Sequence, residues 1–147
     1  DGKILVMATP MTLKEAKFHK LLDRYRDKRE IEPVPCGGLM EYVEQGILEG
    51  DELDDYLREK LKPFMDSKIS SIVLGCTHYP FVKNAIEKVV GQDVDIIDGS
   101  LGTARELMRR LKEKDLLNDS KEKGTIEMIN SSNKQELIDL SWKLIEM

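Results

Sequence analysis

The 147-residue sequence is poor in aromatic residues, cysteine, histidine and proline. Aromatic residues make up 5% of it, and it contains two cysteines, two histidines and five prolines. Two widely separated cysteines argue against a disulfide framework and suit a reducing cytoplasm. No apolar run approaches the roughly 20 residues that cross a bilayer, and we identify no secretory or transit segment. We therefore expect a cytoplasmic protein without a membrane partner.

An excess of positive charge is also lacking. The chain has 23 Lys and Arg against 28 Asp and Glu, for a net charge of -5. Because phosphate binding needs a concentrated basic surface, we expect no nucleic-acid partner. The composition, 40% apolar and 35% charged, is typical of a globular domain. The chain enters an apolar run at Ile4 without an initiator methionine, so we expect it to be a piece of a longer protein.

Short apolar runs alternate with stretches of helical periodicity along the chain. A run with two prolines is expected at a sheet edge or as an irregular strand, since proline cannot donate to a ladder. The alternation predicts an α/β fold with a mainly parallel sheet. The predicted strands are residues 3–8, 30–35 (the proline-containing run), 69–75, 93–98 and 125–130.

The helix boundaries are predicted from capping signals. Thr12 with Glu15, and Thr103 with Glu106, each form a T-x-x-E capping box. Pro80 suits the first turn of a helix. The polar stretch 118–124 is the one credible linker, and it separates residues 1–117 from a tail of residues 125–147. The predicted helices are residues 12–28, 39–47, 51–61, 80–90, 103–111 and 132–147.

A cysteine and a histidine follow the predicted strand 69–75. In open α/β sheets, ligands bind at the carboxyl ends of the strands. Cys76 sits at such an end with His78 two residues later, so the thiol is placed to lose its proton readily. The alternative is a buried cysteine that only fills space. Three polar residues in succession, Cys76, Thr77 and His78, favour the reactive cysteine, because buried polar groups need partners.

Spacing argues against other cysteine chemistries. A phosphatase-type nucleophile needs an arginine six positions on, where Val82 stands, and a thioredoxin-like pair needs a cysteine at Tyr79. No G-x-S-x-G elbow is present. A zinc site would have to use residues without the short paired spacing of such sites, namely Cys36, Cys76, His78 and His19. We therefore predict no metal site.

The stretch GCTHYPF, residues 75–81, closely resembles the second cysteine motif of glutamate racemases, which are cofactor-independent enzymes of the aspartate/glutamate racemase superfamily. Aspartate racemases usually have Glu after Gly-Cys-Thr, so His-Tyr-Pro favours the glutamate branch. Four more stretches resemble the family in the right order: residues 5–18, 33–46, 95–111 and 125–145. The resemblance covers essentially all of this chain but only about the latter half of a racemase.

The resemblance implies a flavodoxin-like parallel sheet flanked by helices, as one half of a two-domain, pseudo-symmetric racemase. It implies interconversion of L- and D-glutamate for peptidoglycan synthesis, without a cofactor. The tail, residues 125–147, would pack on the first domain, which is the missing amino-terminal half. We therefore expect that half as a partner, and we expect a homo-oligomer.

The resemblance also implies roles for single residues. Two thiols would face opposite sides of the substrate α-carbon, with Cys76 as one of them. His78 would tune Cys76 or stabilise the developing charge. Thr77 would hold the carboxylate or ammonium group of the substrate. Thr9 and Thr12 match a Thr-x-x-Thr pair that lines the substrate, although Thr12 could instead serve only as a helix cap.

Glu44 matches the glutamate of a V-E motif and would act through His78 or the pocket wall; the alternative is an ordinary exposed helical glutamate. The D-S-G, P-Y-G and C-N-T-A motifs of the family's first half are absent from this sequence. Cys36 matches a region without a catalytic thiol, so it is a poor replacement for the partner cysteine. We expect the isolated chain to be inactive. The alternatives are a non-catalytic module that binds carboxylates or self-associates, and a relative of aspartate racemases.

Overall fold

The computed structural model describes residues 2–25 and 27–146, and it divides into two compact units. The first unit extends to Asp98 and the second begins at Gly99. The division predicted from the sequence, with a linker at residues 118–124, concerns the domains of a racemase and stays a prediction.

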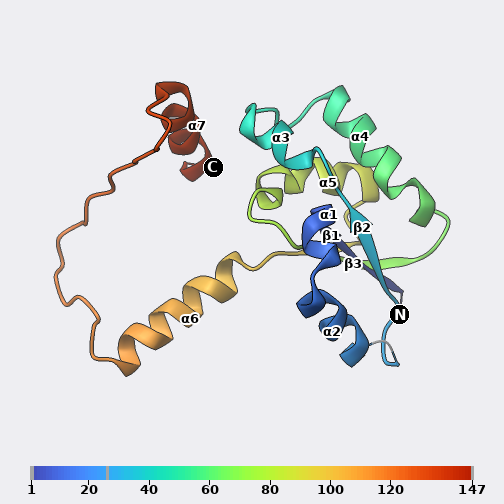
Figure 1. Cartoon of the computed structure of the whole chain (residues 1–147), viewed down its shortest axis with the longest axis horizontal. Coiled ribbons are helices and arrows are strands. Elements are labelled where there is room, and N and C mark those ends of the chain that lie inside the picture. The colour runs from blue at the N-terminus through green and yellow to red at the C-terminus, as the bar shows by residue number, and fades with distance from the viewer. Residues whose placement is uncertain (1, 26, 147) are drawn as a thin grey trace. The chain divides into compact units, whose positions relative to one another are not determined.

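A four-stranded parallel sheet forms the centre of the first unit (Figure 1). Its strands are β1 (Lys3–Ala8), β2 (Ile31–Pro35), β3 (Ile69–Leu74) and β4 (Asp95–Ile97), in the order β2-β1-β3-β4. The predicted α/β fold with a parallel sheet is thus confirmed. The proline-containing strand β2 does lie at an edge, where the missing proline N–H costs no ladder bond.

Helices and short 3-10 turns connect the strands. Figure 1 shows α3, α4 and α5 on one side of the sheet and α2 on the other. The elements are α1 (Pro10–Lys14), α2 (Ala16–Tyr25), α3 (Leu39–Glu44), α4 (Asp51–Leu61), η1 (Lys62–Phe64), η2 (Tyr79–Val82) and α5 (Lys83–Val90). Pro80 lies in the first turn of η2, as predicted, and Gly91 ends α5 with a φ of 91°.

The core lies between the sheet and helices α3 to α5. Strand residues that alternate along β1 and β3 point to this face, and the helices contribute leucines and valines at helical spacing. Burial of each such side chain stabilises the fold by about 1.5–3 kcal/mol. The fully buried residues include Leu5, Met7, Ile72, Leu39, Val43, Leu53, Leu57, Leu61 and Ile86.

Both predicted capping boxes are wrong. Thr9, not Thr12, caps α1: its hydroxyl accepts the N–H of Thr12 at 3.2 Å. The following Pro10 has the fixed φ that suits the first helical position, so the helix begins earlier than predicted. Glu15 then ends α1 in an extended conformation, which breaks the single predicted helix into α1 and α2.

Helix α6 (Ser100–Glu113) likewise begins before its predicted cap. Thr103 lies within the helix and donates its N–H to the carbonyl of Gly99 at 2.9 Å. The helix α7 (Gln135–Ile145) is present but begins after Ser132.

The second unit consists of α6, α7 and the segment 114–134 between them, which has turns but no regular secondary structure. The strand predicted at residues 125–130 is wrong. A strand needs a neighbouring strand to pair its backbone groups, and no strand of the described residues pairs with this segment. Its side chains Ile126 and Ile129 are 65% and 80% exposed. No described residue of this unit is buried. Among the described residues, no helix has the length and apolar character needed to cross a membrane.

Candidate functional site

The turn that follows β3 lies beside the carboxyl ends of β1 and β2. The Gly75 N–H donates to the Met7 carbonyl at 2.8 Å, and the Cys36 N–H donates to the Ala8 carbonyl at 2.9 Å, so the ladder continues past the strands. A Cβ at Gly75 would lie 3.0 Å from the Cβ of Ala8 and 3.2 Å from the Met7 carbonyl oxygen. The close approach of β1 therefore requires glycine before Cys76.

Cys76 and His78 come together at this turn. The Sγ of Cys76 lies 3.8 Å from the Nδ1 of His78, a hydrogen-bond distance for sulfur. Both residues are half-buried, so a ligand could reach the thiol. A tight turn, in which the Tyr79 N–H donates to the Cys76 carbonyl at 3.2 Å, holds the two side chains on one side.

Glu44 completes a chain of three side chains. It is the last residue of α3, and its Oε1 lies 3.3 Å from the Nε2 of His78. Gly38, with a φ of 96°, turns the chain from β2 into α3 and so directs that helix toward the histidine. The Glu44 carboxylate beside Nε2 favours a proton on that nitrogen, which leaves Nδ1 able to accept the proton of the Cys76 thiol. The arrangement can therefore generate a thiolate.

Thr9 and Thr12 lie at the carboxyl end of β1, the strand between β2 and β3. Their hydroxyl oxygens are 2.9 Å apart. Of the two hydroxyl protons, one lies between these oxygens and the other remains able to donate to a ligand. Thr77 is exposed, and its side chain makes no hydrogen bond to the described residues. The structure thus joins Cys76, His78 and Glu44, whereas the threonines form no hydrogen bond with them in the described part of the chain.

The second cysteine, Cys36, is buried, in contrast to the half-buried Cys76. Cys36 is 1% exposed, and its thiol donates to the Val34 carbonyl at 3.3 Å. Burial raises the pKa of Cys36 to about 12, so it remains a thiol at neutral pH. No group of three His, Cys, Asp or Glu residues placed to hold a metal ion is found in the described ranges.

Two tyrosines that sequence analysis left without a role contact the segment after β2. The Tyr79 hydroxyl donates to the Cys36 carbonyl, and the Tyr56 hydroxyl donates to the Gly37 carbonyl, each at 2.9 Å. The only signal for Tyr79 in the sequence is its place within the GCTHYPF stretch. Nothing in the spacing points to its partner.

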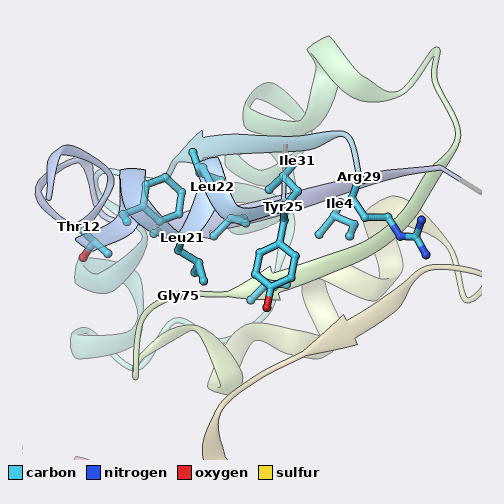
Figure 2. Close-up of a pocket in the computed structure, with 12 residues that line it drawn as sticks. Ile4, Thr12, Leu21, Leu22, Tyr25, Arg29, Ile31 and Gly75 are labelled. Atoms are coloured by element: carbon cyan, nitrogen blue, oxygen red, sulfur yellow. The ribbon is translucent and has the colours of Figure 1, made fainter. Parts of the chain in front are cut away.

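An apolar cavity of about 390 Å³ lies on the other face of the sheet, between α2 and the strands (Figure 2). Phe18, Leu21, Leu22 and Tyr25 line it from the helix side. Figure 2 shows Thr12 and Gly75 at one end and Arg29 at the other. Gly75 and Thr12 line this cavity, whereas Cys76 and His78 do not.

Comparisons of sequence and of structure both relate this chain to glutamate racemases. No protein-family model matches the chain. Glutamate racemase of Clostridium perfringens is 54% identical over 146 residues, which cover 99% of this chain and 56% of that protein. The crystal structure of Francisella tularensis glutamate racemase with D-glutamate superposes with a TM-score of 0.78 at 27% identity, over 99% of this chain and 54% of that one.

A glutamate racemase structure from Bacillus anthracis superposes with a TM-score of 0.67 at 31% identity and covers 80% of this chain and 44% of that one. The chain spans about half the length of the curated relatives it matches. The motif resemblance found in the sequence is thus confirmed, and nearly all of the chain is homologous to glutamate racemases, of which it represents the carboxyl-terminal half.

Proposed function

We propose that this chain supplies one of the two proton-carrying thiols of a glutamate racemase, and that Cys76 is that thiol. The observation that carries the proposal is the contact of Cys76 with His78, and of His78 with Glu44, at the carboxyl end of β3. Homology to glutamate racemases supports the reaction, and the D-glutamate bound by the Francisella tularensis protein supports the substrate.

The chemistry begins with the thiol proton. It moves from Cys76 Sγ to His78 Nδ1, and the Glu44 carboxylate stabilises the positive charge that forms on the imidazole. The thiolate then takes the α-proton of glutamate: the C–H bond breaks, an S–H bond forms, and the electron pair remains on the α-carbon. A planar carbanion inverts only when a donor on the opposite face returns a proton. That donor would be a thiol from the amino-terminal half.

The three threonines are proposed to hold the substrate. A carboxylate needs hydrogen-bond donors, and the Thr9 and Thr12 pair has one hydroxyl proton free for this purpose. The exposed Thr77 adds a hydroxyl and a backbone N–H next to the thiol. Together they would fix the α-carbon over Cys76.

In the whole protein this activity would supply D-glutamate for peptidoglycan in the cytoplasm. The isolated chain would not racemise glutamate, because it offers a proton carrier on one face only. A second candidate, a module that associates with copies of itself, is favoured by the exposed apolar side chains of the second unit, among them Leu107, Ile126 and Ile129. Sedimentation as a compact monomer would contradict self-association.

The test of the proposed function is a chimera. This chain, joined in one polypeptide to the amino-terminal part of Clostridium perfringens glutamate racemase, should racemise glutamate in a circular dichroism assay. Cys76→Ala should lower kcat by about 100-fold or more, as expected for loss of a general base. Cys36→Ala is the matched control and should retain activity. A Cys76→Ala chimera as active as its parent would contradict the proposal.

A further inference from the structure

Two contacts join the Cys76 turn to the segment that carries Glu44. One of them is open to solvent and the other is buried. The outer contact is that of the Glu44 carboxylate with the Nε2 of His78, whose side chains are 53% and 31% exposed. The inner contact is the hydrogen bond from the Tyr79 hydroxyl to the Cys36 carbonyl, which is buried. Both connect the same two segments, residues 76–79 and 36–44.

The outer contact is too weak to set its own geometry. Solvent-exposed contacts between charged or polar side chains contribute little net stability, because solvent screens them and both side chains lose freedom. Glu44 and His78 therefore need their backbones held in place by something else. The inner contact is suited to that task because an unpaired buried hydroxyl is costly, so the bond is kept wherever the core is packed.

Tyr79 is placed to hold both segments at once. Its side chain is 0% exposed, and its own N–H donates to the Cys76 carbonyl. The carbonyl that its hydroxyl contacts also accepts the N–H of Leu39, the first residue of α3, at 3.4 Å. The phenol thus connects the thiol turn with the start of the helix that ends at Glu44. Burial raises the pKa of Tyr79, so the hydroxyl keeps its proton and remains a donor.

We propose that the Tyr79 hydroxyl is a positioning group that sets the contact between Glu44 and His78, and through it the reactivity of Cys76. The proposal rests on the proposed function of these three residues. Tyr79 itself does not contact the reacting atoms. Its removal should uncouple Glu44 from Cys76 without removing either residue.

A double-mutant cycle on this chain tests the proposal. The measured quantity is the rate of Cys76 alkylation by iodoacetamide near neutral pH, followed by peptide mass spectrometry. Glu44→Gln should slow alkylation about fivefold in the otherwise unchanged chain and have little effect in Tyr79→Phe, since coupled neighbours give non-additive effects. A purely structural role of Tyr79 would lower the melting temperature and leave the Glu44→Gln effect intact.

Tyr42→Phe is the matched control. It also removes a phenolic hydroxyl, from α3 itself, but that group donates to the exposed Glu52. The Glu44→Gln effect should persist in Tyr42→Phe. An undiminished Glu44→Gln effect in Tyr79→Phe would overturn the role of Tyr79 alone. No Glu44→Gln effect in the unchanged chain would overturn the proposed function, and this role with it.

If Tyr79→Phe does not fold, the unchanged chain provides a second measurement. The hydroxyl proton of Tyr79 should then be visible by NMR and protected from exchange with water, because its bond to the Cys36 carbonyl is buried. A hydroxyl proton that exchanges freely would overturn the proposal.

Discussion

The Nδ1 of His78 lies 3.8 Å from the Sγ of Cys76, two residues before it in the chain. The sharp turn after β3 brings these two atoms together. In a continuing strand, the two side chains would point to the same face but would lie farther apart. The turn therefore creates a thiol with a base beside it. The carboxylate of Glu44, from a different segment, lies 3.3 Å from the other ring nitrogen of His78.

The two cysteines should differ in reactivity. Cys76 is half-buried beside His78, whereas Cys36 is buried with a pKa of about 12. We expect iodoacetamide to modify Cys76 at neutral pH and to leave Cys36 unmodified in the folded chain, because the thiolate is the nucleophile. Peptide mass spectrometry measures this, with the urea-unfolded chain as the control in which both thiols react. Equal modification of Cys76 and Cys36 in the folded chain would contradict the predicted difference in reactivity.

The imidazole of His78 should control the rate of that reaction. His78→Asn removes the proton acceptor, so alkylation of Cys76 should slow about tenfold or more. His19 is the only other histidine and lies exposed on α2, so His19→Asn is the matched control and should leave the rate unchanged. If both substitutions had the same effect, His78 would not act on Cys76.

The folded chain should lose stability in alkali. Burial raises the pKa of Cys36 to about 12 and that of Tyr79 above its usual range. The unfolded chain releases the Cys36 proton above about pH 9 and the Tyr79 proton above about pH 10, whereas the folded chain retains both. These two neutral side chains therefore contribute their full stability to the folded chain below about pH 9. As the pH rises toward 12, the free energy of unfolding falls by about 1.4 kcal/mol per pH unit for each of them that ionises in the unfolded chain.

Urea denaturation at several pH values between about 8 and 11 measures this loss. Cys36→Ala should show a shallower decline than the unchanged chain, since one of the titrating groups is gone. A free energy of unfolding that stays constant over this range would contradict the burial of both groups.

Two leucines should differ in their contribution to stability. Leu57 of α4 is fully buried, whereas Leu107 of α6 is 60% exposed. Leu57→Ala should lower the free energy of unfolding by about 2–5 kcal/mol through lost burial and a cavity. Leu107→Ala should change it by no more than about 0.5 kcal/mol. Urea denaturation compares them, and equal losses would show that α4 does not pack as described.

Much of the sheet could be predicted because its strands carry a local signal. A parallel strand covered on both faces reads as an apolar run, as residues 4–8 and 72–74 do. The prolines of β2 marked it as an edge strand. The run 125–130 shows the limit of this signal, since a strand exists only where a partner does, and pairing is not encoded in the run itself.

A further error came from overlapping helix signals. Thr9-Pro10 and Thr12 with Glu15 both indicate a helix start, and only the structure decides in favour of Thr9. The closeness of Cys76 and His78 could be predicted because both follow one strand. Glu44 was found through the family resemblance alone. The partner of Tyr79 could not be predicted, since a backbone carbonyl leaves no mark in the sequence.

The central claim is that Cys76 moves a proton on a single face of the glutamate α-carbon. Mass spectrometry of D- and L-glutamate incubated with this chain in deuterated water, followed by chiral chromatography, tests it most directly. We expect deuterium to enter one enantiomer with its configuration retained, and Cys76→Ala to abolish the exchange. Conversion of either enantiomer into the other by the chain alone, or exchange that survives Cys76→Ala, would contradict the account.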